Sequence, residues 1–324
     1  MSFKLGSINK RAVLLSEDHY YDLETISEGD LSYSSSEALF KIDKLNDLNE
    51  NLNNFKASGS LDAVNFDSPV SEPKNCYAVG LNYRNHAEES GMPIPEVPMI
   101  FTKHTTCLVG ATADIELRSN YVDYEAELVV VLGKEGKNIS KSDAWSHVAG
   151  VCIGQDISDR PTQFAASPAQ FNLGKSFDTF GPMGPFLVSP DLVDAEKGLS
   201  IECRVNDELR QSDNTSDLIF DVPDIIAYLS EILTLNVGDV IFTGTPGGVG
   251  VMEGKFLKDG DILSTSIEGL GKMNNKCVRI EDHSRADFIP ECSNLYLTKK
   301  INMDNLKLYL KGPSGYSQKV LLMK

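Results

Sequence analysis

Two glutamates on one face of a predicted strand are the first residues here that could do chemistry. Glu125 and Glu127 lead into the apolar run Leu128–Leu132, and side chains two apart on a strand point to the same face. Two such carboxylates repel each other and are costly to bury unless a positive group lies between them. Two glutamates separated by one residue more often lie in solvent, so this pair alone is weak support for a metal site.

A third acidic residue strengthens the metal interpretation. Asp156 follows the apolar run Val148–Ile153, at the end of another predicted strand. Carboxylate oxygens suit a hard divalent ion such as Mg²⁺, Mn²⁺ or Ca²⁺ rather than zinc or copper. Three carboxylates around an octahedral ion leave positions for water and a chelating substrate, which is typical of a catalytic site. We therefore predict one divalent ion, held by Glu125, Glu127 and Asp156.

Several other polar residues could act beside such an ion. Lys175 lies in a glycine-flanked turn, where its ammonium could bind a substrate carboxylate or stabilise an enolate oxygen. Arg160 and Gln163 could share one face of a turn, the first for a carboxylate or a structural salt bridge and the second for a carbonyl. His86 and Glu89 are one helical turn apart, so the carboxylate could orient the imidazole to take a proton from water. The alternative for Lys175 is an ordinary surface lysine, and the alternative for His86 and Glu89 is an ordinary pair on the surface.

The segments that must position these residues are mostly strands. From about residue 74 onward, short runs rich in Val and Ile are bounded by Gly, Pro, Asn or Asp, which predicts a mainly β domain. A helix is predicted after Asp221, which can cap it, with Pro223 in the first turn. A shorter helix is expected near residues 140–147. The predicted strands are Cys76–Val79, Met99–Phe101, Leu128–Leu132, Val148–Ile153, Phe186–Val188, Ile201–Val205, Val240–Phe242 and Ile262–Ile267.

The first 60 residues read as a separate small module. Apolar stretches at Phe3–Ile8, Ala12–Leu15 and Tyr20–Leu23 are separated by polar turns, as in a β-meander. A capping box at residues 34–37 precedes an apolar stripe from Leu39 to Phe55, which predicts an amphipathic helix. We expect a small N-terminal β/α module over 1–70, a main domain over 71–281 and a C-terminal extension over 282–324. The extension could be a hairpin, a helix or a partner-contacting tail.

Composition limits the class of protein. The net charge of −17 argues against nucleic acid, which needs clustered Lys and Arg. The sequence contains no run of roughly 18 apolar residues, so it predicts no transmembrane helix. The first residues lack the apolar core of a signal peptide, and six scattered cysteines without a CxxC pair favour reduced thiols. We expect a cytoplasmic protein with no nucleic-acid or membrane partner, and composition alone says nothing about its chemistry.

Residues from about 74 to 281 resemble the catalytic domain of the fumarylacetoacetate hydrolase family. The resemblance rests on five short motifs in matching order and spacing: Gly80–His86, Asp123–Glu127, Gln155–Arg160, Gly174–Pro182 and Thr243–Gly250. It implies an α+β, mainly β fold, a mixed β-sandwich roll, and a homodimer. It also implies one Mg²⁺ or Mn²⁺ per chain, with the predicted acidic triplet matching the family's metal ligands.

The resemblance also implies roles for individual residues. His86 and Glu89 fall where hydrolytic and decarboxylating members carry a His–Glu dyad on a mobile lid. Lys175 and Gln163 are expected beside the reacting oxygen, and Thr245 and Tyr83 at the substrate. Arg160 stays open between substrate contact and structural salt bridge. His104 replaces a proline often seen after Phe-x-Lys in relatives, so the role of Lys103 stays open.

The leading functional hypothesis is hydrolysis of a carbon–carbon bond in a β-diketo acid. An acylpyruvate, a fumarylacetoacetate-type compound or a diketo sugar acid would be cleaved through a metal-stabilised enolate. The same enolate would serve an oxaloacetate decarboxylase, or an isomerase or hydratase of a dienoic diacid of the 2-hydroxyhepta-2,4-diene-1,7-dioate type. Two other classes are a non-catalytic divalent-ion-binding protein and a two-metal phosphoryl enzyme. The chain lacks an EF-hand pattern and a phosphate clamp.

Overall fold

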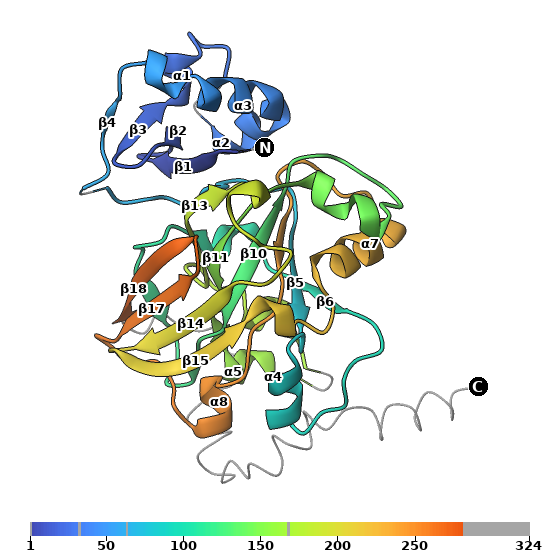
Figure 1. Cartoon of the computed structure of the whole chain (residues 1–324). Helices are drawn as coiled ribbons and strands as arrows, with labels where there is room; N and C mark the ends of the chain where they lie inside the picture. The colour runs from blue at the N-terminus through green and yellow to red at the C-terminus, as the bar shows by residue number, and fades with distance from the viewer. Residues whose placement is uncertain (1, 32–33, 63, 167–168, 281–324) are drawn as a thin grey trace.

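One long mixed sheet runs through most of the chain (Figure 1). The computed structural model describes residues 2–31, 34–62, 64–166 and 169–280, and the expected extension at 282–324 lies outside these ranges. The strand order is β4-β3-β2-β1-β13-β11-β10-β16-β5-β6, with β7 paired to β13. These strands are β1 (Lys4–Ile8), β2 (Arg11–Leu15), β3 (His19–Asp22), β4 (Gly59–Ser60), β5 (Cys76–Gly80), β6 (Met99–Thr102), β7 (Leu108–Val109), β10 (Ala126–Leu132), β11 (Val148–Gln155), β13 (Gly181–Val188) and β16 (Val240–Phe242).

A second sheet packs against the first, so the expected α+β, mainly β class is confirmed. Its order is β15-β14-β17-β18-β8, and β9 (Val122–Asp123) pairs separately with β12 (Ser158–Asp159). All eight strands predicted from apolar runs are present. The polar strands β15 and β18 were not predicted, because each buries only some of its side chains. The second sheet consists of β8 (Ile115–Leu117), β14 (Ser200–Val205), β15 (Glu208–Asn214), β17 (Ile262–Ile267) and β18 (Gly271–Arg279).

Strand β10 is buried on both faces, which explains its unbroken apolar run. Leu128 and Val130 belong to the core between the two sheets, whereas Val129 and Val131 belong to the core under the N-terminal helices. Each such side chain contributes about 1.5–3 kcal/mol by burial. The strand that leads from the acidic residues is therefore firmly held.

The helices are short, apart from α7. The predicted helix is confirmed as α7 (Val222–Ile232): the Asp221 carboxylate accepts from the Asp224 N–H at 2.8 Å, and a proline lies in the first turn. The helix expected near residue 140 is the 3₁₀ helix η4 (Lys141–His147). The other helices of this part are α4 (Arg84–Glu89), η3 (Thr105–Cys107), α5 (Arg160–Gln163), α6 (Phe171–Gly174), η5 (Pro190–Leu192), η6 (Thr215–Asp217) and α8 (Gly250–Glu253).

The N-terminal segment has the expected three-stranded meander, β1–β2–β3, but its helix is broken. The predicted continuous helix is divided into α2 (Ser35–Ala38), η1 (Leu39–Lys41), α3 (Ile42–Glu50) and η2 (Leu52–Asn54), and α1 (Leu23–Ile26) precedes them. Asn and Asp compete with helical hydrogen bonds, so their abundance around residue 51 accounts for the end of α3 there. The apolar stripe nevertheless packs, with Leu39, Leu45 and Leu48 buried.

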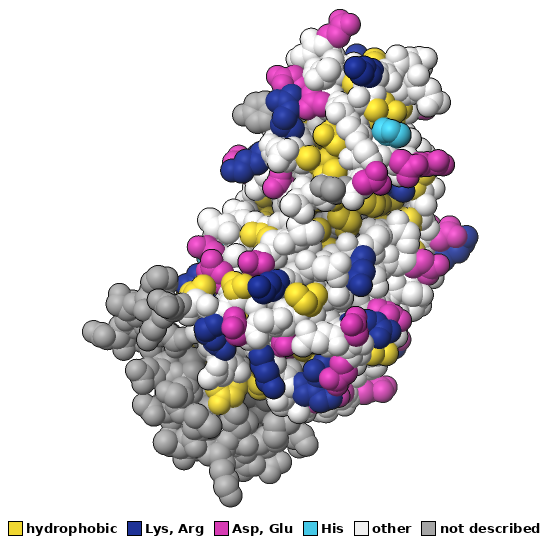
Figure 2. Space-filling model, turned by 90° about the vertical axis from the view of Figure 1, so that its left-hand side faces the viewer, with side chains coloured by type: hydrophobic (Ala, Val, Ile, Leu, Met, Phe, Trp, Pro, Cys, Tyr) yellow, Lys and Arg dark blue, Asp and Glu magenta, His cyan; other side chains and the backbone are white. Residues whose placement is uncertain are grey.

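The N-terminal strands continue the main sheet without a gap. β1 pairs antiparallel with β13, aligning Leu5 with Leu187. A further cluster, including Ile8, Val13 and Phe66, packs around Phe186, and Figure 2 shows hydrophobic atoms gathered where this segment meets the rest. The expected boundary near residue 70 stays a prediction.

Two findings bear on the environment of the chain. Within the described residues, no helix is both long and apolar enough to span a membrane. The five cysteines in that part are buried and form no disulfide, and Cys292 lies outside it.

Candidate metal centre and active site

The topology brings the predicted site residues to one end of the main sheet. β10 begins opposite the end of β11, since Ala126 pairs with Gln155. The loop Thr243–Gly248 follows β16, and α4 follows β5, which runs parallel to β16. Figure 1 shows α4, α5 and α8 gathered at this end.

The acidic triplet forms a compact, buried cluster. Glu125, Glu127 and Asp156 each place one carboxylate oxygen within 4.8 Å of the others. Glu127 is 1% exposed and Asp156 is completely buried. Glu125 directly precedes β10 and Glu127 lies on it, so the start of this strand supplies both glutamates, and its antiparallel pairing with β11 brings the third acid beside them.

Glu127 is the carboxylate that lacks a balancing charge. Its Oε2 accepts from the Gly244 N–H at 2.6 Å, and among the described residues no cation pairs with it. Burial raises the pKa of Glu127 well above its ordinary value, and the charges of Asp156 and Glu125 raise it further. A buried carboxylate without a partner is costly, so a bound cation fits this position.

Glu125 is held as an anion by two cations. Arg160 Nη2 lies 2.7 Å from its Oε1, and Lys175 Nζ lies 2.7 Å from its Oε2. Burial acts to raise the pKa of Glu125, but Lys175 and Arg160 outweigh it and lower this pKa to about 2, with a smaller contribution from His86.

Two lysines hold Asp156 from either side. Lys175 Nζ bridges it to Glu125, at 2.6 Å from Asp156 Oδ2, and Lys103 Nζ lies 2.7 Å from Oδ1. Lys103 also donates to the carbonyls of Lys175 and Phe180. Burial works against the charged form of Lys103, but Asp156 outweighs it and raises the pKa of this lysine. The sequence alone leaves the role of Lys103 open, and the Phe-x-Lys pattern shared with relatives is the signal that points to it.

The ion-paired side chains of this centre favour a bound cation. Four buried carboxylates and three buried cations meet here: Glu125, Glu127, Asp156, Asp123, Arg160, Lys103 and Lys175. The centre thus has one carboxylate more than it has cations, and in the part of the chain that the structure describes Glu127 is the one without a cationic partner. The oxygen-only donor set fits Mg²⁺ or Mn²⁺.

Arg160 lies in a buried ion-pair network. Its Nε and Nη2 donate to Asp123 Oδ2 at 2.9 and 2.7 Å, and its Nη1 donates to Gln163 Oε1 at 2.8 Å. Asp123 also accepts from the backbone N–H groups of Gly250 and Val251. The salt-bridge alternative for Arg160 is thus present, whereas substrate contacts by Arg160 and Gln163 stay predictions. Asp123, part of the quoted acidic motif, was not singled out.

The His–Glu pair is formed as its spacing predicted. His86 Nδ1 lies 2.7 Å from Glu89 Oε1, and Glu89 Oε2 accepts from the Gly248 N–H at 2.9 Å. Because a carboxylate only accepts, Nδ1 carries the hydrogen and Nε2 of the neutral ring is left as a base. The pair can therefore move a proton.

Thr245 and Tyr83 are buried at the same end. Thr245 Oγ1 donates to the Ala126 carbonyl at 2.9 Å and accepts from Gln211 Nε2 at 2.8 Å. The hydroxyl hydrogen is therefore already used, and the expected contact of Thr245 with the substrate stays a prediction. The Tyr83 hydroxyl has no partner in the described part of the chain. Burial raises the pKa of Tyr83, with Asp213 and Glu127 adding to it. An unpaired buried hydroxyl is costly, which favours a polar ligand beside it.

The fold and the site define a class of enzymes that comparison with known proteins identifies. Residues 75–278 match the family model described as fumarylacetoacetate (FAA) hydrolase C-terminal. The chain belongs to the fumarylacetoacetate hydrolase family, as the sequence motifs predicted.

Three relatives show which activities occur among proteins similar to this chain. The human protein named oxaloacetate tautomerase FAHD2A, mitochondrial, is 45% identical over 219 residues, which cover 66% of this chain and 70% of that protein. Fumarylacetoacetate hydrolase from Exiguobacterium antarcticum is 31% identical with a TM-score of 0.73, covering 86% of this chain and 100% of that one. Maleylpyruvate hydrolase from Sphingobium sp. SYK-6, solved with manganese(II) and pyruvate, is 26% identical with a TM-score of 0.72 and the same coverage.

Proposed function

We propose that this chain is a divalent-metal-dependent keto–enol tautomerase of small 2-keto diacids, with oxaloacetate as its substrate. The observation that carries the proposal is the convergence of three buried carboxylates, Lys175 and the His86–Glu89 pair at one end of the sheet. The identity of 45% to a protein named oxaloacetate tautomerase favours this reaction over the others that share an enolate.

Glu125, Glu127 and Asp156 would hold the ion, Mg²⁺ or Mn²⁺, one per chain. When bound, it would polarise the 2-keto group and offset the negative charge that develops on the adjacent oxygen. The one carboxylate in excess over the cations of this centre supports this assignment, as does the structure of a family member with manganese(II) and pyruvate.

The side chains of this chain would carry the proton transfer. His86 Nε2 takes a proton from C3 of the keto form, the released electron pair makes the C2–C3 bond double, and the charge passes to the C2 oxygen. The Lys175 ammonium and the Gln163 amide stabilise this oxygen, which takes up a proton from solvent to give the enol, while the His86 imidazolium releases the C3 proton to solvent. Glu89 keeps the imidazole oriented throughout. The carbon skeleton is unchanged, and the reverse sequence returns the ketone.

Carbon–carbon bond hydrolysis is the second candidate, as first expected from the sequence. The similarity to maleylpyruvate hydrolase and the presence of the His–Glu pair support it. In that reaction His86 deprotonates a water molecule instead of C3. The water attacks the distal carbonyl, and cleavage leaves the enolate of the smaller keto acid, so two acids are released.

The fate of the carbon atoms separates these reactions. Purified protein with Mn²⁺ is incubated in D₂O with oxaloacetate, or with an acylpyruvate, and followed by NMR. We expect rapid deuterium incorporation at C3 of oxaloacetate with an intact skeleton, and loss of this activity in His86→Ala. Pyruvate and carbon dioxide would indicate decarboxylation, and two acids from the acylpyruvate would indicate hydrolysis. Either result, without C3 exchange above the metal-only rate, would contradict tautomerase activity.

We also propose that the chain forms a homodimer, as the family resemblance implies, which sedimentation velocity of the full chain would test. A cytoplasmic location stays a prediction. The human relative is named as a mitochondrial protein, so the similarity gives the cytoplasmic expectation no support.

A further inference from the structure

The helix that carries His86 is fixed by a strand of the other sheet. Asn85, the residue before His86 on α4, donates its side-chain amide to the Asp213 carboxylate on β15. The amide oxygen of Asn85 accepts from the Gly247 N–H at 3.0 Å. A single side chain thus joins α4 to both β15 and the loop after β16.

Strand β15 presents two side chains toward this end of the site. Gln211 and Asp213 are two residues apart and lie on the same face of the strand. Gln211 Nε2 donates to Thr245 Oγ1 and to the Pro246 carbonyl, both at 2.8 Å, and its Oε1 accepts from the Ala126 N–H at 3.0 Å. One face of β15 therefore contacts three segments: the loop after β16, the start of β10 and helix α4.

The loop itself rests on β15 and requires glycine to do so. Gly248 has a φ of +94°, and a Cβ there would lie 2.1 Å from the Arg210 carbonyl oxygen. Its N–H donates to Glu89 Oε2 at 2.9 Å. A Cβ on Gly247 would lie 3.3 Å from Glu89 Oε2, so this residue too is in close contact with α4. Helix and loop are packed as one unit on the strand.

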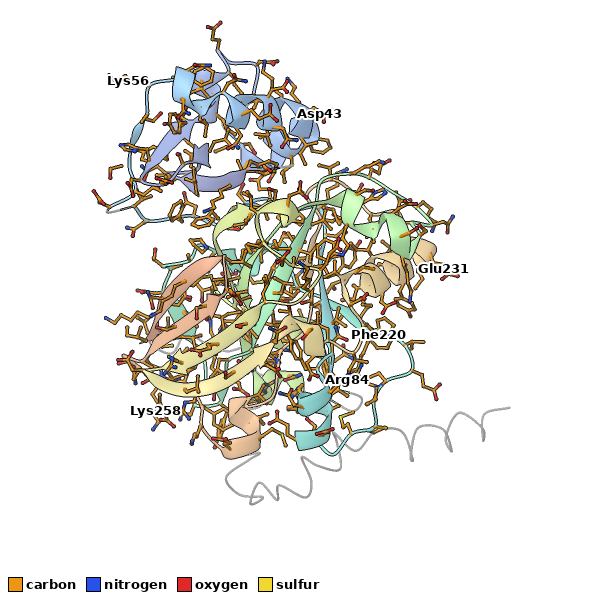
Figure 3. The ribbon with its side chains drawn as sticks, viewed as in Figure 1. Asp43, Lys56, Arg84, Phe220, Glu231 and Lys258 are labelled. Atoms are coloured by element: carbon orange, nitrogen blue, oxygen red, sulfur yellow. The ribbon has the colours of Figure 1, made fainter. Side chains whose placement is uncertain are left out.

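We propose that Asp213 and Asn85 are positioning residues that set the His86–Glu89 pair for proton transfer. α4 has six residues, too few to be stable by itself, so its orientation depends on these contacts. Figure 1 shows α4 beyond the end of the main sheet, and Figure 3 marks it by Arg84. The metal-binding carboxylates belong to the segments around β10 and β11, so losing the contact disturbs His86 and leaves ion binding intact.

The first test compares three variants of β15 in the full chain with Mn²⁺ and oxaloacetate, and it rests on the proposed function. Asp213→Ala removes the acceptor, and we expect kcat to fall about tenfold or more. Asp213→Asn keeps an oxygen that accepts from Asn85, so its activity should stay close to that of the wild type. Ser212→Ala, on the opposite face of the strand, is the matched control and should be unchanged.

Two further readouts distinguish positioning from general damage. The Mn²⁺ dissociation constant, measured by electron paramagnetic resonance, should be the same in Asp213→Ala and the wild type. In a His86→Ala background, Asp213→Ala should cause no additional loss, because it acts through His86. A weakened Mn²⁺ affinity, or a further tenfold loss without His86, would overturn the proposal.

Hydrogen exchange tests the contact without any assumption about the reaction. The Ala87 and Ser90 N–H groups donate within α4, to Tyr83 and His86 carbonyls. We expect both amides to exchange faster in Asp213→Ala, and to stay protected in Asp213→Asn and Ser212→Ala. Unchanged protection in Asp213→Ala would overturn the positioning role. Because this result does not depend on oxaloacetate turnover, it decides the proposal even if the proposed reaction is wrong.

Discussion

Glu127 is the residue whose environment most directly calls for a metal ion. It is buried, close to two other carboxylates and paired with no cation among the described residues. Glu127→Gln keeps the shape and removes the charge. Mutating a residue that only hydrogen-bonds to a metal ligand typically lowers metal affinity 10–100-fold. Because Glu127 would be a ligand itself, its loss should weaken Mn²⁺ binding by roughly a hundredfold or more.

The same substitution should stabilise the protein when no metal is present. Burial and two neighbouring carboxylates make Glu127 costly in the metal-free centre, and Gln removes this cost, so chelated Glu127→Gln should melt above the chelated wild type. The shift in Tm on adding Mn²⁺ should be much smaller than in the wild type. Thermal melts with and without chelator measure both effects. A variant that melts lower than the wild type under chelation, with an undiminished Mn²⁺ shift, would contradict the assignment.

Lys103 is the second residue that decides the stability of the centre. Its side chain is fully buried against Asp156 Oδ1, and removing one partner of a buried ion pair costs about 3–5 kcal/mol. We expect Lys103→Met to lower the free energy of unfolding by roughly this amount or somewhat less, because Lys175 still pairs with Asp156. Urea unfolding measures it, with Lys134→Met as an exposed control. Equal stability of the two variants would show that the buried pair contributes nothing.

Site residues were predictable when local spacing joined them. The alternation of a strand paired Glu125 with Glu127, and one helical turn paired His86 with Glu89. Lys103 meets Asp156 across 53 residues of sequence. No local pattern encodes such a contact, because it depends on how the sheet and the loop before β13 fold together.

At the scale of elements, the Arg11–Asp22 ion pair links β2 to the start of α1. The Arg11 hydrogen bond lowers the pKa of Asp22 against the opposing effect of burial. The pKa of Asp22 is lower in the folded protein than in the unfolded chain. The ion pair therefore stabilises the fold at pH values above the unfolded-state pKa, and this stabilisation is lost as the pH falls through the folded-state pKa. Because Arg11 is 42% exposed, we expect Asp22→Asn to cost only about 1 kcal/mol at neutral pH.

The pH dependence isolates this pair from the helix cap. Asn can still accept from the Thr25 N–H, as Asp22 does at 2.9 Å, so the cap of α1 is kept. The difference in stability between the wild type and Asp22→Asn should shrink below about pH 4 and disappear under more acid conditions. Denaturant titrations over pH measure it. A difference that is constant with pH would mean that the ion pair is not its source.

Elements were predictable where one pattern governed the whole segment. β10 is apolar throughout because it is buried on both faces, and α7 has a cap, a proline and an apolar stripe. β15 lies at the edge of its sheet with several exposed polar side chains, so its sequence resembles a loop. This strand nonetheless supplies Gln211 and Asp213, whose contacts with the loop after β16, with β10 and with α4 are long-range.

For the whole molecule, we expect the first 60 residues to be necessary for folding. β1 covers the edge of β13, and Leu5, Leu39 and Leu45 share one core with Val129 and Leu187. A chain beginning after residue 60 would expose that core, so it should be insoluble or lack fixed packing in near-ultraviolet circular dichroism. A soluble, cooperatively folding product with normal Mn²⁺ affinity would show instead that residues 71–281 fold independently.

Metal dependence of the enol chemistry is the central claim, and a parallel titration tests it most directly. Metal-free protein is titrated with Mn²⁺ while bound ion and enol–keto exchange of oxaloacetate are measured on the same samples, with Glu125→Ala/Glu127→Ala as the comparison. We predict one tightly bound ion per chain, exchange that rises with occupancy, and neither effect in the double variant. Full exchange in the chelated wild type, or in the double variant, would contradict the account.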